Sequence, residues 1–490
     1  MKKSMQAIIF PALLSLVFLL FSVQIYAYSQ DKIAKIDKMI QAYNDTGQFN
    51  GSVLVAESGK IIYIKGFGLA NIEWNIPNKP DTKFRLGSIT KQFTSMLILQ
   101  LVEQGKIDLQ GKLSDYLPYY RKDTGSQVTI HQLLTHSSGI PSYTGLPNFF
   151  EEISRNPYPV EKFVKTYCSG DLQFEPGSKY VYNNSGYFLL GAIIEKITEK
   201  TYEEVVKENI FLPLGMKNSG YDRHGPIIPD RASGYYNTFD GYTNAPYLDM
   251  SLPYAAGSLY STVEDLYIWD QALYTEKLLS AKMKELIFTP HIANYGYGWG
   301  IMQKGLPDSK QKLTSISHGG GINGFNAWIE RLVDEKHLIV LLNNTPGANL
   351  GRMSDSIIRI LYDKPYNLPK KSIAKVMFET LMGKDMKSAI EQYETLKNDH
   401  RKEYNFSVGE LNNLGYYLLN DKKRAEDAIK IFKLNIEAFP ANGNGYDSLA
   451  EAYMISGDKK LAIKNYAKSL ELDPNNTNAV EKLNELVKNE

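Results

Sequence analysis

A serine and a lysine three residues apart, Ser88 and Lys91, form a pair whose spacing suits nucleophilic catalysis. In a helix, residues three apart lie on one face, one turn from each other. The apolar residues that follow predict a helix that begins near Ser88 and ends at Gly105. A helix N-terminus supplies positive potential and free backbone N–H groups. Because burial favours the neutral form of a lysine amine, we expect Lys91 to accept the proton of the Ser88 hydroxyl.

The Ser-x-x-Lys pattern is weak by itself, since most such pairs lie on solvated helices or loops. It recurs at Ser29/Lys32, Ser309/Lys312, Ser372/Lys375 and Ser456/Lys459. The pair at Ser88 differs in its setting, because a glycine precedes it and an apolar helix follows it. Two further motifs downstream could complete a site.

The first of these motifs is Tyr182-Asn183-Asn184, which precedes an apolar helical stretch at 187–194. A tyrosine hydroxyl near Ser88 can take its proton, if nearby positive charge lowers the tyrosine pKa, and pass it to the leaving group. The amide of Asn184 can hydrogen-bond both a substrate amide and Lys91. The alternative is that Tyr182 only packs in the core.

The second motif is His318-Gly319-Gly320-Gly321. Glycines in a strand allow a substrate backbone to lie close to the strand edge. Backbone N–H groups of Ser88 and of a residue near Gly321 would then form an oxyanion hole. We expect His318 to face the cleft as a hydrogen-bond donor or partial cation; the alternative is a structural histidine.

The elements that must position these residues predict an α+β fold. An amphipathic helix at 31–49 and a β-hairpin at 52–65 come first, and residues 106–290 give mostly helical signals. Strand signals return at 295–303, 313–317, 324–332 and 337–343, and a helix at 350–362 follows. We therefore expect one antiparallel sheet, built from both ends of the domain and flanked by helices with an all-helical subdomain. Capping boxes predict helix starts at Thr129-x-x-Gln132 and Ser261-x-x-Glu264.

The composition is that of a globular protein, with 43% hydrophobic and 22% charged residues among 490. The formal net charge of +1 argues against nucleic acid or an anionic membrane surface as the main partner. Neither a cofactor nor a metal is expected. A zinc peptidase is unsupported because no His-Glu-x-x-His occurs, and an α/β-hydrolase because no Gly-x-Ser-x-Gly occurs. The single cysteine, Cys168, is expected to be a buried thiol rather than a nucleophile.

Residues 1–29 have the features of a secretory signal peptide. Lys2 and Lys3 form the basic start, an apolar run covers 7–23, and small residues at Ala27 and Ser29 mark a cleavage site before Gln30. We therefore expect a periplasmic or secreted protein. The alternative is an uncleaved N-terminal membrane anchor.

The chain changes character after residue 362. Residues 363–372 hold prolines and lysines typical of a linker, and 373–490 give helical signals throughout. A 34-residue offset relates Ala428 to Ala462, Phe432 to Tyr466 and Pro440 to Pro474. This pattern closely resembles the tetratricopeptide (TPR) repeat, which implies stacked helix pairs and a possible protein partner or second copy.

In their order, the three motifs resemble those of the serine β-lactamase and penicillin-binding-protein superfamily, closest to its class C β-lactamase-like branch. Similar stretches are Leu134-Thr-His-Ser-Ser-Gly-Ile-Pro141, Phe174-Glu-Pro-Gly177, Pro213-Leu-Gly-Met216 and Ala256-Gly-Ser-Leu-Tyr-Ser-Thr262. The resemblance covers roughly residues 35–362 and implies a hydrolase domain at 31–362. It implies that Ser88 is the acylated nucleophile, that Lys91 and Tyr182 share general-base and general-acid duty, and that Asn184 orients the substrate. Gly320 and Gly321 would border the substrate.

One departure from the family is His318, which stands where many members have lysine. A mostly neutral histidine anchors a substrate carboxylate less strongly than lysine does. The resemblance therefore favours an exported esterase-like or D-amino-acid peptidase-like serine hydrolase over an efficient β-lactamase. We expect its activity to change between about pH 5.5 and 7.5 as His318 titrates. The alternative function is a weakly active or inactive binding protein that recruits a partner through its repeats.

Overall fold

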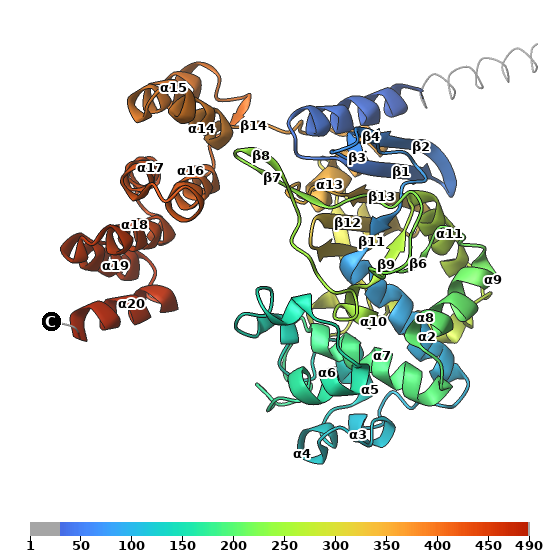
Figure 1. Ribbon diagram of the computed structural model, residues 1–490. Coiled ribbons are helices and arrows are strands. Elements are labelled where there is room, and N and C mark those ends of the chain that lie inside the picture. The colour runs from blue at the N-terminus through green and yellow to red at the C-terminus, as the bar shows by residue number, and fades with distance from the viewer. Residues whose placement is uncertain (1–29, 489–490) are drawn as a thin grey trace, which may run out of the picture. The chain divides into compact units, whose positions relative to one another are not determined.

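The computed structural model describes residues 30–488, so the predicted signal peptide lies outside the described residues (Figure 1). The chain forms two compact units. The first comprises residues 30–237 and 242–368, and the second comprises 238–241 and 369–488. Within the described part of the chain, no helix combines the length and apolar character needed to cross a bilayer.

The first unit is built on a six-stranded antiparallel sheet in the order β10-β11-β12-β13-β1-β2. Its strands are β1 (Gly51–Glu57), β2 (Lys60–Phe67), β10 (Gly300–Gly305), β11 (Lys312–Ile322), β12 (Phe325–Leu332) and β13 (His337–Asn343). The two ends of the unit meet where β1 pairs with β13, in a register that places Val53 opposite Leu341. The prediction of a sheet assembled from both ends is confirmed.

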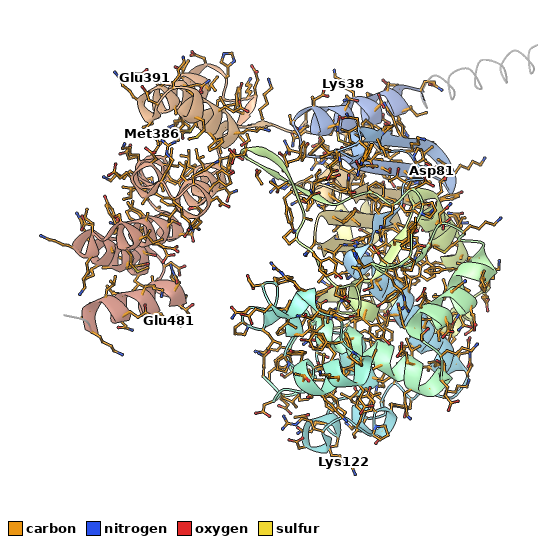
Figure 2. All side chains as sticks on the ribbon, in the orientation of Figure 1. Lys38, Asp81, Lys122, Met386, Glu391 and Glu481 are labelled. Carbon is orange, nitrogen blue, oxygen red and sulfur yellow. The ribbon has the colours of Figure 1, made fainter. Side chains whose placement is uncertain are left out.

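Both faces of this sheet are covered, which explains the continuous apolar run of β13. Leu338 and Val340 point into the core beneath α2 (Thr90–Glu103) and α11 (Val263–Leu273). Ile339 and Leu341 pack on the other side with the helix at 30–45 and α13 (Leu350–Leu361). The helix at 30–45 is amphipathic, as predicted: Lys38 points away from the sheet in Figure 2. These are the layers of an α+β domain.

Helices and short strands fill the middle of the unit. The helices are α2 (Thr90–Glu103), α3 (Leu113–Tyr116), α4 (Lys122–Gly125), α5 (Ile130–Leu134), α6 (Val160–Tyr167), α7 (Asn184–Thr198), α8 (Tyr202–Val206), α9 (Leu212–Leu214), α10 (Tyr254–Gly257), α11 (Val263–Leu273), α12 (Ala281–Phe288) and α13 (Leu350–Leu361). The short strands are β3 (Leu69–Asn71), β4 (Ile76–Pro77), β5 (Phe84–Arg85), β6 (Gly220–Tyr221), β7 (Tyr235–Thr238), β8 (Gly241–Asn244) and β9 (Leu259–Ser261). Figure 1 shows α2 and α7 within this helical part.

One of the two predicted helix starts is correct. Thr129 caps α5 as predicted, since its side chain accepts from the backbone N–H of Gln132. The start at Ser261 is wrong, because Ser261 is the last residue of β9 and pairs with Phe84. Thr262 caps α11 instead.

The strand bounds at the C-terminal side of the sheet also differ from the sequence prediction. The strand expected at 295–303 begins only at Gly300, and the one expected at 313–317 runs on to Ile322. β11 therefore contains the His318–Gly321 motif, which pairs residue by residue with β12. The cross-strand pairing holds the glycine run in extended form despite its low strand propensity.

Residues 369–488 of the second unit are mostly helical and contain one two-residue parallel pair, β14 (Lys371–Ser372) and β15 (Tyr404–Asn405). Its helices are α14 (Ile373–Gly383), α15 (Met386–Asp399), α16 (Val408–Tyr416), α17 (Ala425–Ala438), α18 (Gly443–Ser456), α19 (Lys459–Leu472) and α20 (Thr477–Lys488). Ala428, Phe432, Ala462 and Tyr466, which the 34-residue offset relates, are buried in its core. Gly415 lies directly against the Phe432 ring, where a Cβ would come within 2.4 Å.

Candidate active site

Ser88 lies at the start of the helix that the sequence predicts. A short 3₁₀ turn, η1 (Gly87–Ile89), carries Ser88 and leads directly into α2. Gly87 has a φ of +54° and Gly105 has a φ of +69°, so glycines in the left-handed region stand at both ends of this segment. The predicted helix is confirmed, with its first turn as 3₁₀ rather than α.

The amine of Lys91 is buried and has three oxygen neighbours. Its Nζ lies 3.0 Å from Ser88 Oγ, 2.9 Å from Asn184 Oδ1 and 2.9 Å from the carbonyl oxygen of Ala256. Burial lowers the pKa of Lys91 well below its ordinary value of 10.5. A neutral amine has two N–H groups and one lone pair. Since the oxygens of Asn184 and Ala256 can only accept, they take the two N–H groups, and the lone pair remains for the Ser88 hydroxyl.

Tyr182 lies beside both Lys91 and Ser88. Its ring centroid is 5.0 Å from Lys91 Nζ, and its hydroxyl hydrogen-bonds the Ser88 side chain. The residue is 37% exposed, yet burial of its hydroxyl raises the pKa above 10 and outweighs the Ser88 hydrogen bond, which lowers it. A lowered pKa, the condition under which Tyr182 could take the Ser88 proton, is therefore not met. Tyr182 is a neutral phenol, which can relay and donate a proton, whereas the neutral Lys91 amine can accept one.

Asn184 is the first residue of α7, and three contacts fix it. Besides accepting from Lys91, its side chain donates to Thr144 Oγ1 over 3.1 Å, and its backbone N–H donates to Ser142 Oγ over 3.2 Å. Asn183 caps the helix by accepting from the backbone N–H of Gly186. The predicted link between Asn184 and Lys91 is thus present.

The glycines of β11 lie directly against the Ser88 turn. A Cβ on Gly320 would come within 1.9 Å of the Leu86 carbonyl oxygen and 3.3 Å of the Ser88 nitrogen. A Cβ on Gly87 would come within 2.8 Å of the Gly321 nitrogen. Only residues without side chains permit this approach. It places the backbone of Gly321 beside the turn that carries Ser88, which is compatible with an oxyanion hole formed by their N–H groups.

His318 does not have the predicted cationic role. Its Nδ1 donates to the carbonyl oxygen of Gly319 over 2.6 Å, and its Nε2 accepts from the Tyr295 hydroxyl over 2.9 Å. Burial and the nearby Lys91 amine lower the pKa of His318 to about 4. The ring is therefore neutral at pH 7. The prediction that His318 titrates between pH 5.5 and 7.5 is wrong, because its pKa lies near 4. Its centroid lies 6.2 Å from that of Tyr182.

A pocket of about 310 Å³ opens over Ser88. Its lining consists of Gly87, Ser88, Tyr143, Thr144, Phe149, Phe150, Asn184, Leu248, Pro253, Ala256, Gly257, Gly321, Ile322 and Asn323. None of these described lining residues carries a charged side chain. His318 is not among them.

The sequence analysis did not identify several of these groups. The Ala256 carbonyl that fixes Lys91 leaves no sequence signal, because every residue has a carbonyl. Phe149, Phe150 and Leu248 come from loops whose paths the sequence does not define. Cys168 is excluded as a nucleophile, since it is fully buried and burial raises the pKa of its thiol to about 12.

Comparison with known proteins agrees with this geometry. Residues 36–363 match the family model described as Beta-lactamase. Penicillin-binding protein 4* of Bacillus subtilis (strain 168) is 31% identical over 375 residues, covering 71% of this chain and 80% of that protein. The teichoic acid D-alanine hydrolase of Staphylococcus aureus is 28% identical over 350 residues, covering 70% of this chain and 82% of that protein.

The structural comparison leads to the same family. The crystal structure of a penicillin-binding protein from Bacillus halodurans is 28% identical in sequence and superposes with a TM-score of 0.58, covering 66% of this chain and 98% of that one. Relatives of this chain are hydrolases of the serine β-lactamase superfamily. The chain belongs to the β-lactamase family of serine hydrolases, together with the penicillin-binding-protein-like enzymes.

Proposed function

We propose that this protein is an exported acyl hydrolase of the class C β-lactamase-like branch that forms an acyl-enzyme at Ser88. The observation that supports this best is the arrangement around Lys91 Nζ. Two acceptors, Asn184 Oδ1 and the Ala256 carbonyl, occupy its N–H groups, and Ser88 Oγ lies 3.0 Å away. A buried neutral amine held in this way is a general base directed at the nucleophile.

The reaction follows from the positions of these groups. Lys91 takes the hydroxyl proton as Ser88 Oγ attacks the substrate carbonyl carbon. The carbonyl oxygen becomes an oxyanion that accepts hydrogen bonds from the N–H groups of Ser88 and Gly321. As the intermediate collapses, the bond to the leaving group breaks, and Tyr182 donates a proton to that group and regains one from Lys91. Water then attacks the acyl-enzyme by the same steps in reverse order, which releases the acid and frees Ser88.

The lining of the pocket supports a substrate class. Phe149, Phe150 and Leu248 give it an apolar wall, and none of the described lining residues offers a cation to a carboxylate. A carboxylate brought into such a site loses hydration without gaining a partner. We infer that esters, and amides of D-amino acids, are better substrates than β-lactams or peptides that end in a free carboxylate. The similarity to a teichoic acid D-alanine hydrolase supports chemistry on D-alanyl esters.

The second unit supports a role in protein interaction. Its successive helices and the buried residues 34 apart along the chain agree with TPR-like repeats. We propose that these repeats bind a protein partner. Export by the 1–29 segment remains a prediction from the sequence, as does the division into a hydrolase domain at 31–362 and repeats at 373–490.

The test is a hydrolysis panel with the purified full chain: p-nitrophenyl acetate, p-nitrophenyl butyrate, a D-alanine amide, a D-Ala-D-Ala peptide and a chromogenic cephalosporin. We expect turnover of the first three and little of the last two. Intact mass after treatment with an uncharged phosphonate should show one adduct, which Ser88→Ala loses. Ser309→Ala, which removes the serine of another Ser-x-x-Lys pair, should keep the adduct. If the wild-type chain forms no adduct at Ser88, the chain is instead an inert binding protein.

A further inference from the structure

A buried histidine, His136, holds the segment that carries Tyr182. It follows α5 within Leu134-Thr-His-Ser-Ser-Gly139, is 1% exposed and has a φ of +57°. A positive φ is uncommon for a residue other than glycine, although histidine adopts it more often than most residues do. The backbone at His136 therefore has a conformation that most side chains rarely adopt.

His136 makes hydrogen bonds on both sides of Tyr182. Its backbone carbonyl oxygen accepts from the N–H of Val181 over 2.9 Å. Its ring Nδ1 accepts from the N–H of Asn183 over 3.1 Å. Between these two bonds, the imidazole ring lies against the Tyr182 ring, with centroids 4.3 Å apart and planes inclined by 40°. His136 thus contacts the Tyr182 ring and also hydrogen-bonds the backbone on both sides of Tyr182.

The hydrogen bond to Asn183 also extends the effect to α7. Asn183 caps that helix, and Asn184 follows as its first residue and accepts from Lys91. His136 is thus hydrogen-bonded to the backbone segment that carries Tyr182, which lies beside Lys91, and Asn184, which accepts from Lys91.

The ring can do this only as a neutral imidazole. Because Nδ1 accepts, the proton must lie on Nε2, which has no hydrogen-bond partner among the described residues. The rings of Tyr180, Tyr187 and Tyr295 surround it, at 4.8–5.7 Å between centroids. Burial, together with the nearby Lys91 and His318, lowers the pKa of His136 well below 6.5, so the acceptor remains available.

We infer that His136 is a positioning residue for catalysis, which holds the Tyr182 hydroxyl at Ser88 Oγ by accepting from the Asn183 N–H and packing against the phenol ring. This inference rests on the proposed acyl-enzyme chemistry. Misplacing a catalytic group by about 1 Å can cost about 100-fold in rate without weakening substrate binding. The effect should therefore fall on kcat rather than KM.

Two substitutions separate the parts of this role. In His136→Gly, the glycine adopts the positive φ without strain, but the Nδ1 acceptor and the imidazole ring are lost. His136→Asn also tolerates positive φ, and its Oδ1 can take the place of Nδ1. We expect His136→Gly to lower kcat for p-nitrophenyl acetate by about 10- to 100-fold with KM within about twofold. His136→Asn should recover most of that loss. The matched control is His131→Asn, which replaces a partly buried histidine in the neighbouring α5 that bonds Tyr297 rather than the Tyr182 segment.

The inference is overturned if His136→Gly keeps wild-type kcat, or if His136→Asn is as slow as His136→Gly while both fold. Crystal structures of the two variants test it apart from activity. We expect the Tyr182 hydroxyl to leave hydrogen-bond distance of Ser88 Oγ in His136→Gly and to stay in His136→Asn. An unmoved Tyr182 in His136→Gly refutes the inference even if the wild-type chain proves inert, whereas inertness alone refutes only the proposed function.

Discussion

The amine of Lys91 lies 3.0 Å from Ser88 Oγ, and within residues 30–488 its other hydrogen bonds go to two uncharged oxygens, those of Asn184 and Ala256. Desolvation by burial lowers the pKa of Lys91. Under the proposed mechanism, burial therefore produces the base, and the surrounding oxygens direct its lone pair toward Ser88.

Replacing Lys91 with methionine should remove the base while keeping the volume of the side chain. We expect kcat/KM for p-nitrophenyl acetate to fall by about 100- to 10,000-fold, the range of general-base contributions. Stability should hold or rise, because a buried amine is replaced by an apolar group. Stopped-flow measurement of the acylation burst and a thermal melt check both parts. Lys106→Met, an exposed site just after the same helix, is the control; a comparable loss there would contradict the assignment.

The buried His318 should make the protein less stable in acid. Its pKa is about 4 in the folded chain and 6.5 in an ordinary environment. Between those values the unfolded chain binds a proton that the folded chain does not, so the free energy of unfolding falls as the pH drops from 6.5 to 4. The full contribution is about 3 kcal/mol.

Urea unfolding at pH 7 and pH 4.5 measures this effect. All four tryptophans belong to the first unit, so their fluorescence reports on the unit that contains His318. His318→Gln should reduce the loss of stability between the two pH values, whereas the exposed His400→Gln should leave it unchanged. Equal losses in wild type and His318→Gln would show that His318 does not titrate as its burial implies.

A methyl group at Gly320 should separate β11 from the Ser88 turn. The added Cβ would come within 1.9 Å of the Leu86 carbonyl oxygen, so one backbone segment must move. We expect kcat to fall by about 100- to 1,000-fold, as for loss of an oxyanion donor, and stability to fall by about 1–3 kcal/mol. Gly305→Ala on β10, where the Cβ meets nothing within 4 Å, should retain activity. Wild-type kcat in Gly320→Ala would show that the glycine strand is not part of the oxyanion hole.

The apolar wall of the pocket should select for the acyl chain. Phe150 is 53% exposed and lines the pocket. Phe150→Ala should lower kcat/KM for p-nitrophenyl butyrate by about 3- to 10-fold more than for the acetate, since about 1 kcal/mol of apolar contact is lost for the longer chain. Trp74 is an aromatic residue that is 80% exposed and lies outside the pocket. Trp74→Ala should change kcat/KM for neither ester. An equal effect of Phe150→Ala on both esters would show that the acyl chain does not contact Phe150.

Local signals in the sequence were sufficient to predict the helix after Ser88 and most strands of the sheet. The spacing of Ser88 and Lys91, the apolar helix behind them and the strands at both ends of the first unit predict the catalytic helix and the antiparallel sheet, because helical and strand periodicities are local properties of the chain. The Thr129 capping box is local too, and it is correct. The helix start predicted at Ser261 is wrong because Ser261 pairs with Phe84, a residue far away in the sequence, and this pairing keeps it in a strand.

The protonation states and the shape of the pocket were decided only by the tertiary structure. Burial makes Lys91 a base, keeps Tyr182 a phenol and makes His318 neutral, and burial depends on what the rest of the chain packs around each group. The Ala256 carbonyl acts as a ligand of Lys91 only because α10 folds against α2. The sequence determined which functional groups are available, and folding determined which of them meet and in which charge state.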